Sequence, residues 1–311
     1  MLSLIIPIYH NEGTITELME AVAAIDRGID EDLEAVFVID GSPDRCYEIL
    51  REGLPHQVYR SQLILLSRNF GAFPAIRAGL QVGIGDRFAV MAADLQEPPE
   101  LVVEMAQLLR ENEFDVVVGV REGRSDPFLT QMTSKIFWSF YRRYVVPDIP
   151  PGGVDIFGCN RAFRDVLLTL GERHSSLIAQ IFWLGFRRTT VSYVRKKRQH
   201  GKSAWTLSKK VGYLMDSVFA FTDLPIKLLI RGGGFVMVAA GLLGVIIGIG
   251  RLLGYIEVPG YAMTINVIVF LSAAQLLGLG IVGSYSWRTY ENTKARPIAI
   301  PMRIEIFRHE R

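Results

Sequence analysis

An acid and an amide stand two residues apart at the end of an apolar run. The run covers residues 88–93, and Asp94 and Gln96 follow it directly. It predicts a buried strand, while the Pro-Pro-Glu sequence at 98–100 predicts the first turn of a helix. Asp94 and Gln96 are therefore expected at the carboxyl end of a strand, where open α/β sheets bind ligands. Their oxygens suit a hard divalent cation shared with phosphates, so the pair predicts a Mg²⁺ or Mn²⁺ site.

Four more apolar runs alternate with helix-like segments around this strand. They cover residues 2–8, 33–39, 63–66 and 115–120. Thr14-Ile15-Thr16-Glu17 has the spacing of a capping box at the start of a helix, Ser42 is placed to cap another, and a helix is expected from Pro98 to about Glu113. The alternation predicts an α/β fold with a mostly parallel, doubly wound sheet whose strand ends converge on one rim.

Polar residues follow the other strands at this predicted rim. Tyr9, His10 and Glu12 come after the first strand, and Asp40 comes after the second. Asp40 fits either a helix-capping turn or a hydrogen bond to a nucleotide base or ribose, and Asp94 on the same rim favours the nucleotide. Glu12 is equally well explained as a solvated turn acid. His10 fits a turn better than a catalytic base.

The middle of the chain carries aromatic, acidic and basic features. Residues 124–150 combine aromatic and basic side chains, which is typical of an interfacial helix, although a core helix would show the same periodicity. After a Pro/Gly-rich break, Asp155 is a single acid within an extended segment, which indicates a site residue. The basic segment 189–210 is compatible with a solvated face, with contact to anionic lipid, or with phosphate binding by Gly201, Lys202 and Ser203.

Two uncharged stretches, 232–250 and 258–287, are each long enough to cross a bilayer core, which needs about 20 residues. Cations cluster outside the pair, so the positive-inside rule predicts that both termini and the preceding domain are cytoplasmic. The glycine-rich first span permits close helix packing and hence self-association. The expected division is a domain over 1–207, an interfacial helix over 208–230, two spans over 231–288 and a tail over 289–311.

The overall composition excludes several other classes. The net charge of +2 gives no nucleic-acid-binding signature, and two cysteines make no disulfide framework. The N-terminus lacks the charged and long apolar regions of a signal peptide and is expected to form the first strand. A cation site on a domain joined to a membrane hairpin suggests transfer from a soluble phosphorylated donor to a lipid acceptor. A phosphate acceptor would need cations such as Arg121, Arg198 and Lys202 rather than a strong base.

Five short motifs stand out along the chain: IPIYHNE from Ile6, DGS from Asp40, SRNFG from Ser67, DLQEPPE from Asp94 and GKSAW from Gly201. Together they resemble the motifs of GT-A family 2 glycosyltransferases that load polyprenyl phosphate. The resemblance extends from residue 2 to about 296 and includes the hairpin. It implies a GT-A fold at the inner membrane and inverting transfer from a nucleotide-sugar, with UDP expected, to undecaprenyl phosphate.

The resemblance also implies roles for individual residues. The donor nucleotide-sugar is expected at Pro7, Tyr9, Glu12, Asp40 and Arg68. The metal is expected at Asp94 and Gln96, with Asp94 also catalytic. Arg121 is expected to be catalytic and to contact phosphate, together with Arg198, Lys202 and Ser203 on the lipid phosphate. Asp155 matches an acid of the acceptor region and is expected to be catalytic.

Three positions depart from the family pattern. Ala92 replaces the first acid of the usual Asp-x-Asp, Ile39 replaces the first acid of Asp-Asp-Gly-Ser, and Ala204 replaces a lysine. Asp94 would then be the main carboxylate on the metal. Two alternatives follow for the whole protein: extension of a lipid-linked glycan, and a non-catalytic membrane scaffold with a degenerate site.

Overall fold

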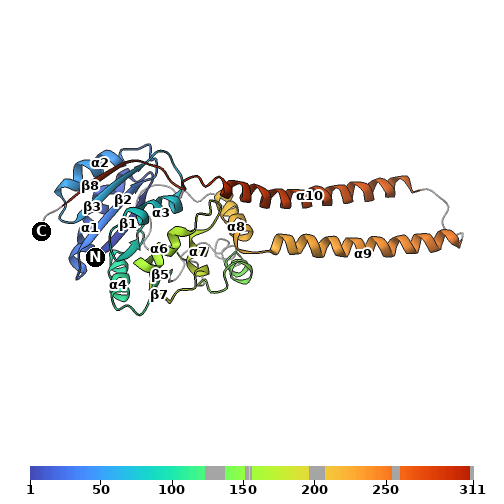
Figure 1. The fold of residues 1–311 in the computed structure, drawn as a ribbon, viewed down its shortest axis with the longest axis horizontal. Helices are drawn as coiled ribbons and strands as arrows, with labels where there is room; N and C mark the ends of the chain where they lie inside the picture. Colours follow the sequence, from blue (N-terminus) through green and yellow to red (C-terminus); the bar gives the residue numbers. More distant parts are fainter. Residues whose placement is uncertain (123–136, 151–153, 155, 196–206, 254–259, 309–311) are drawn as a thin grey trace.

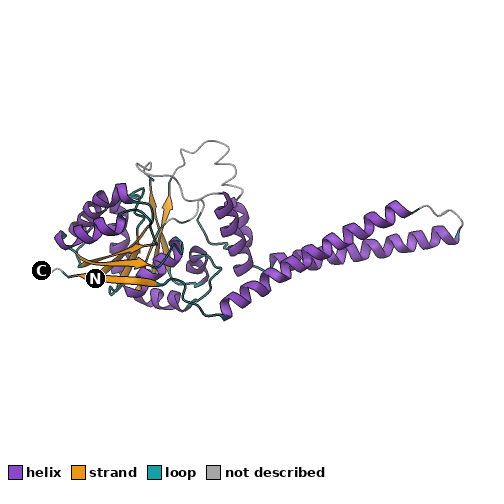
Figure 2. Cartoon of the chain, turned by 90° about the horizontal axis from the view of Figure 1, so that it is seen from above, coloured by secondary structure: helices purple, strands orange, loops and turns teal. Residues whose placement is uncertain are grey.

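The computed structural model describes the chain except for residues 123–136, 151–153, 155, 196–206, 254–259 and 309–311. A domain with a central sheet occupies one end, and two long helices extend from it as a hairpin (Figure 1). The same arrangement is seen from the perpendicular direction (Figure 2). This confirms the expected fold class, a mostly parallel α/β domain followed by two apolar helices.

Eight strands form one sheet, in the order β7-β5-β6-β4-β1-β2-β3-β8. Their bounds are β1 Leu2–Ile8, β2 Leu33–Ile39, β3 Arg60–Leu66, β4 Arg87–Val90, β5 Val116–Arg121, β6 Phe157–Asn160, β7 Arg188–Tyr193 and β8 Pro301–Phe307. The pairs β1–β2, β1–β4, β2–β3 and β5–β7 are parallel, while β6 and β8 pair with their neighbours in the antiparallel sense. The five predicted strands are confirmed, with β4 ending at Val90 rather than at Ala93.

Helices cover both faces of the sheet because its strands are apolar on both sides. One core contains α1 (Ile15–Gly28), α2 (Cys46–Gly53) and α4 (Pro99–Arg110), which pack on alternate residues of β1 such as Leu4 and Ile6. The opposite core contains Ile5 together with α3 (Ala72–Val82), α6 (Arg161–Thr169) and α7 (Leu177–Trp183). Helix α3 lies so close that a Cβ on Gly79 would meet Ile5 Cγ2 at 2.4 Å.

Two predicted helix caps are wrong. Thr14 directly precedes α1, but its hydroxyl makes no capping bond and instead donates to the carbonyls of Asn11 and Ala93, each at 3.0 Å. Ser42 does not cap α2, which begins at Cys46, because its hydroxyl bonds Asp44 and the amide of His10. Both hydroxyls therefore join loops that are distant in the sequence. Short 3-10 turns at Glu12–Thr14 and Leu54–His56 complete this region.

The helix after β4 is confirmed but shorter than expected, from Pro99 to Arg110, and Asn112 just beyond its end has a positive φ of 61°. Of the segment 124–150, residues 137–144 are helical. Tyr141 in this helix is fully buried against the second core, so this part behaves as a core helix.

Helix α8 (Leu207–Phe221) ends before the predicted lead-in helix does, and α9 (Leu224–Leu252) starts a new direction. Thr222 Oγ1 accepts from the amide of Leu224 at 3.3 Å, and the Asp223 carbonyl accepts from Lys227. Pro225, which has no backbone N–H, is tolerated here because N–H groups in the first turn of a helix have no partner within the helix. Helix α10 (Tyr261–Thr293) returns beside α9 toward the domain (Figure 1).

Within α9 and α10, Leu224–Ile247 and Val267–Thr293 are long and apolar enough to cross a membrane, and their most apolar windows bury none of their residues. Strand β8 was not anticipated. It follows α10 and pairs with β3, adding an edge strand to the domain from which the hairpin left. Both chain ends consequently lie on the side of the domain away from the hairpin (Figures 1 and 2).

Candidate active site

The loops that follow β1, β2, β3 and β4 meet at the carboxyl edge of the sheet, as expected for parallel neighbours. Predicted site residues lie in each of them. Pro7 is near the end of β1 and pairs in register with Val38 of β2. Tyr9 follows with its ring 38 % exposed and at 76° to the ring of His10, with centroids 4.4 Å apart. An exposed aromatic ring at this edge provides a surface on which a base can stack.

The first two loops are joined by a reciprocal pair of hydrogen bonds. The amide of Glu12 donates to Asp44 Oδ2, and the amide of Arg45 donates to Glu12 Oε2, each at 3.1 Å. The hydroxyl of Ser42 accepts from the His10 amide at 2.8 Å and donates to Asp44 Oδ1 at 2.6 Å. Glu12 is therefore a loop-linking acid rather than only a solvated turn residue.

Asp44 was not among the predicted site residues. Burial alone would raise the pKa of its carboxyl, but hydrogen bonds from Ser42, Cys46 and the Glu12 amide together hold that pKa below its usual value. Its carboxylate is thus kept charged and fixed in place. The available signal was the Asp-Gly-Ser-Pro-Asp turn, whose second acid is well placed to accept hydrogen bonds from nearby backbone.

Asp40 organises the loop after β3. Its two carboxylate oxygens accept from the amides of Phe70 at 2.7 Å and Gly71 at 2.8 Å, and the residue is only 3 % exposed. Desolvation raises the pKa of this carboxyl against the opposing effect of the two amides and of Arg68. Asp40 is therefore not the helix cap considered above. Its role toward a nucleotide stays a prediction.

The turn after Asp40 and the loop after β3 approach very closely. Gly41 has φ +59°, and a Cβ there would stand 2.2 Å from the carbonyl carbon of Arg68. Only glycine fits such a position. Arg68 places its guanidinium 4.0 Å from the ring centroid of Phe70 and donates to the Asn69 carbonyl. Asp40 and Arg68, both predicted to bind the nucleotide-sugar, are thus brought together.

The turn after β4 carries the predicted cation ligands. Leu95 has a positive φ of 52°, so the chain reverses sharply between Asp94 and Gln96. The backbone N–H of Gln96 donates to Asp94 Oδ1, with 3.4 Å between nitrogen and oxygen. The side-chain oxygen of Gln96 accepts from Arg195 Nη2 at 2.6 Å, and Arg195 Nε lies 3.8 Å from the buried carboxylate of Glu97.

The side-chain oxygens of Asp94 and Gln96 are of the kind that a hard divalent cation binds, and a cation at Gln96 would take the place of the Arg195 guanidinium now bonded to it. Among the residues that the structure describes, no group of three or more His, Cys, Asp or Glu side chains is placed to hold a metal. Phosphate oxygens of a bound nucleotide would therefore have to complete the coordination. Ala92, two residues before Asp94, carries no carboxylate.

Arg121 ends β5 and stands opposite Tyr193 in the parallel β5–β7 pair. The Glu122 amide donates to the Tyr193 carbonyl at 2.8 Å, so the two strands remain paired to this edge. Arg195 follows two residues later, which brings the start of the basic segment to the turn of Gln96. Asp155, Arg198, Lys202 and Ser203 lie outside the described residues, and their predicted roles are not tested.

Comparison with known proteins decides the family. Residues 3–170 match the domain Glycosyl transferase family 2. The chain belongs to this family. It is 33 % identical over 302 residues to the uncharacterized glycosyltransferase YkcC of Bacillus subtilis, covering 96 % of this chain and 92 % of that protein.

A second relative carries a more specific name. The undecaprenyl-phosphate 4-deoxy-4-formamido-L-arabinose transferase of Pectobacterium carotovorum is 30 % identical over 299 residues, covering 95 % of this chain and 90 % of that one. Among solved structures, glucosyl-3-phosphoglycerate synthase of Mycobacterium tuberculosis with Mn²⁺, UDP and its product has a TM-score of 0.43 at 14 % identity. That alignment covers 71 % of this chain and 77 % of the other. The predicted family membership is confirmed.

Proposed function

We propose that this family 2 glycosyltransferase moves a sugar from a nucleotide-sugar, with UDP as the expected nucleotide, to undecaprenyl phosphate. One observation carries the proposal. The loops after β1, β2 and β3, which carry the residues predicted to bind the nucleotide-sugar, are hydrogen-bonded to one another beside the Asp94–Gln96 turn. The same domain carries a hairpin of two long apolar helices that starts and ends at it. The relatives named for undecaprenyl phosphate match nearly the whole chain, hairpin included, which supports a lipid acceptor.

The chemistry is a single displacement. An oxygen of the lipid phosphate forms a bond to C1 of the sugar while the bond from C1 to the diphosphate breaks, which inverts the configuration. A phosphomonoester has its second pKa near 6, so its oxygen is already ionised at neutral pH and needs no strong base. Asp94 and Gln96 would hold Mg²⁺ or Mn²⁺, which neutralises charge on the leaving diphosphate.

The chain's own residues supply positioning. Pro7, Tyr9, Glu12, Asp40 and Arg68 would form the wall of the donor pocket. Arg121, at the end of β5, would contact phosphate together with Arg198, Lys202 and Ser203, while Asp155 would act in the acceptor region. Fixed cations around two phosphate groups favour attack by bringing the reacting atoms together.

The placement in the cell is part of the proposal. Both candidate spans would cross the bacterial inner membrane, with the domain over 1–207, the interfacial helix over 208–230 and the final segment over 289–311 on the cytoplasmic side. Pairing of β8 with β3 supports this topology, because the chain after the second span returns to the domain. A Cβ at Gly241 or Gly244 of α9 would meet nothing within 4 Å, so this face of the helix is open to packing against a second copy of the chain. Self-association through this face stays a prediction.

The deciding experiment is a screen of nucleotide-sugars with undecaprenyl phosphate and the full chain, with products identified by mass. The expected product is one sugar on the lipid monophosphate. Product formed only from a lipid that already carries sugar would establish the glycan-extending alternative. If calorimetry with Mn²⁺ present detects no binding of UDP or other nucleoside diphosphates, the scaffold alternative is correct and the proposal fails.

A further inference from the structure

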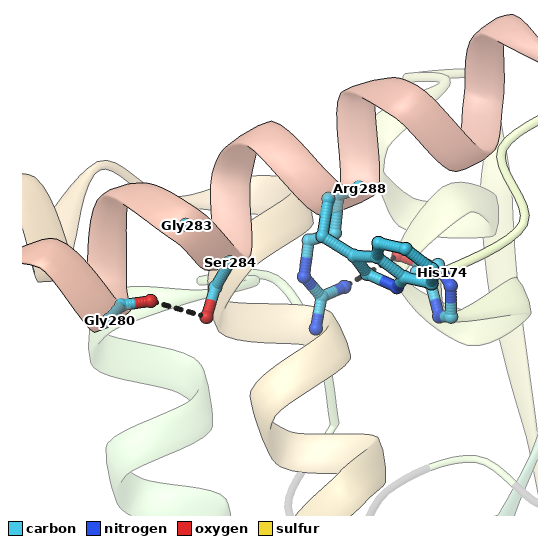
Figure 3. Close-up of a pocket in the computed structure, with 6 residues that line it drawn as sticks. His174, Gly280, Gly283, Ser284 and Arg288 are labelled. Atoms are coloured by element: carbon cyan, nitrogen blue, oxygen red, sulfur yellow. Dashed lines mark hydrogen bonds between the residues drawn. The ribbon is translucent and has the colours of Figure 1, made fainter.

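A groove lies where α10 meets the domain. It has a volume of about 430 Å³ and is lined by His174, Gly280, Gly283, Ser284, Trp287 and Arg288. Figure 3 shows Arg288 and His174 next to each other beneath α10, with Ser284 about one turn away along the helix. The loop carrying His174 is attached to α10, because the His174 carbonyl accepts from Arg288 and the Arg173 amide donates to Asn292.

Several basic side chains lie in or near the groove. Arg288 donates to Asp216 on α8 at 2.8 Å, and His174 Nδ1 lies 3.9 Å from the same carboxylate. Arg173, Lys294 and Arg296 all lie within electrostatic reach of Glu291. Four arginine and lysine side chains thus lie near Asp216 and Glu291, and the further carboxylate at this level, Asp223, is paired with Lys227.

The shape of the groove along the helix suits an extended chain. Gly280 and Gly283 leave the α10 backbone uncovered, and a Cβ at either would meet nothing within 4 Å. Both lie within the apolar segment Val267–Thr293, Gly280 at its middle and Gly283 three residues closer to the domain. Trp287, 56 % exposed, lies at the same level, where an indole ring suits a membrane interface. One end of the groove is therefore cationic and the other is open to the apolar surroundings of the helix.

We propose that this groove binds the phosphate of an anionic bilayer phospholipid, with its headgroup at Arg288 and His174 and an acyl chain along Gly280 and Gly283. The proposal rests on the proposed membrane insertion of α10 and is separate from the sugar-transfer site at the sheet edge. Free phosphate would satisfy the cationic end alone, whereas a lipid also occupies the glycine-lined part. Such a contact would attach the loop of His174, and with it the domain, to the membrane surface.

The test uses the full chain in nanodiscs of phosphatidylcholine with a minor fraction of phosphatidylglycerol, and counts retained phosphatidylglycerol by native mass spectrometry. Two variants attack the groove differently. Arg288→Gln removes the charge, and Gly283→Leu fills the glycine-lined part without changing any charge. Their matched controls are Lys227→Gln, a cation that pairs with Asp223 near the start of α9, and Gly241→Leu, an equally open glycine of α9.

Arg288→Gln should lower phosphatidylglycerol retention about fivefold, the effect of one basic contact at a membrane surface. Gly283→Leu should lower it by a similar factor because the leucine side chain takes the space of the acyl chain, while both controls retain the lipid. Asp216→Asn should raise retention severalfold, because it frees Arg288 from its internal partner. Arg288 with a purely structural role would instead make Asp216→Asn neutral or weakening. Millimolar inorganic phosphate should not displace the lipid.

The proposal is overturned if Gly283→Leu retains phosphatidylglycerol like the parent chain, or if the controls lose it equally. Displacement by inorganic phosphate would assign the site to free anions, and displacement by an equal mole fraction of undecaprenyl phosphate would assign it to the acceptor. Flotation of every variant with the nanodisc lipids checks membrane insertion independently. A failure of insertion is thereby distinguished from a failure of the groove.

Discussion

Individual side chains at the sheet edge have two kinds of work. The carboxylates of Glu12, Asp40 and Asp44 accept hydrogen bonds from backbone amides of neighbouring loops. Asp94 and Gln96 instead lie in a sharp turn between a strand and a helix. The first group joins neighbouring loops, and the second is the pair for which we propose a role as oxygen ligands of a cation. Substitutions in the two groups should therefore differ in which step they impair.

Asp94→Ala is expected to lower metal-dependent turnover at least roughly 100-fold, the effect of losing one charge-stabilising group in a transition state. The residue is only partly buried, so thermal unfolding should change little. Turnover is measured against Mg²⁺ and Mn²⁺ concentration. Ala92→Asp is the matched gain, because it restores the first acid of the family motif and should lower the metal concentration needed. Unchanged activity of Asp94→Ala would remove the metal assignment.

Asp44→Asn is expected to weaken donor binding by about tenfold while changing kcat much less. The asparagine side chain has a single acceptor oxygen, so it cannot accept from both the Glu12 amide and the Ser42 hydroxyl, and a hydrogen bond to a charged group is worth roughly 1.5–3 kcal/mol. Calorimetry with UDP and the KM for the donor measure the effect. Asp30→Asn, an acid 81 % exposed on the far side of α1, serves as the control. Equal donor affinity in both variants would show that the loop link does not shape the pocket.

Neighbouring elements are held together by a second acid, Asp115, at the start of β5. It accepts from the guanidinium of Arg187 at 2.8 and 2.9 Å and from Asn160 Nδ2 at 2.9 Å, and so joins the start of β5 to the last residue of β6 and to the residue before β7. The bond from Arg187 holds the pKa of the Asp115 carboxyl below 3.8, although burial opposes it. Of the connected strands, β5 ends at Arg121, and β7 ends two residues before Arg195.

The pH dependence of unfolding tests this link. Because the folded-state pKa is depressed, the stabilisation from Asp115 is complete above the unfolded value of 3.8 and is lost as pH falls through the lower folded value. The free energy of unfolding of the parent should therefore fall more steeply below pH 3.8 than that of Asp115→Asn. At neutral pH the variant should be the less stable of the two. Parallel pH profiles in denaturant titrations would contradict the prediction.

At the scale of the whole molecule, the chain leaves the domain through α8, forms the hairpin and returns as an edge strand. Glu305 on β8 accepts from Tyr47 and from Arg51 Nε at 3.2 Å, both on α2, and the Ser67 amide bonds the Ile300 carbonyl at 3.0 Å. The segment after the second span is thus fixed beside the loop that holds Arg68. The hairpin is attached to the domain at both of its ends, through α8 before it and through β8 after it.

Glu305→Ala should lower the free energy of unfolding of the domain by roughly 1–2 kcal/mol, because it leaves two donors of α2 without this acceptor. Hydrogen exchange should also become faster at the amides of β8. Glu52→Ala, an exposed acid on the same helix as Arg51, provides the comparison and should be neutral. Unchanged stability of Glu305→Ala would mean that the β3–β8 ladder alone holds the strand.

The sequence determined the features that depend on neighbouring residues. The five strands, the helix after Pro98 and the two apolar spans follow from local periodicity, apolar length and proline position, and all are present in the structure. The family could be predicted from short motifs at strand ends for the same reason. Ends of parallel strands meet at one edge, so Tyr9, Asp40 and Asp94 could be placed together without coordinates.

Only the tertiary structure decided which side chains meet across long separations. Glu12 with Arg45, Gln96 with Arg195 and Tyr47 with Glu305 are hydrogen-bonded pairs whose partners lie tens to hundreds of residues apart. Local patterns contain no information about such pairs, because loop packing and sheet order bring them together. The predicted caps at Thr14 and Ser42 were wrong because tertiary hydrogen bonds took the hydroxyls. Residues 301–307 alternate in polarity, but only pairing with β3 makes them a strand rather than a tail.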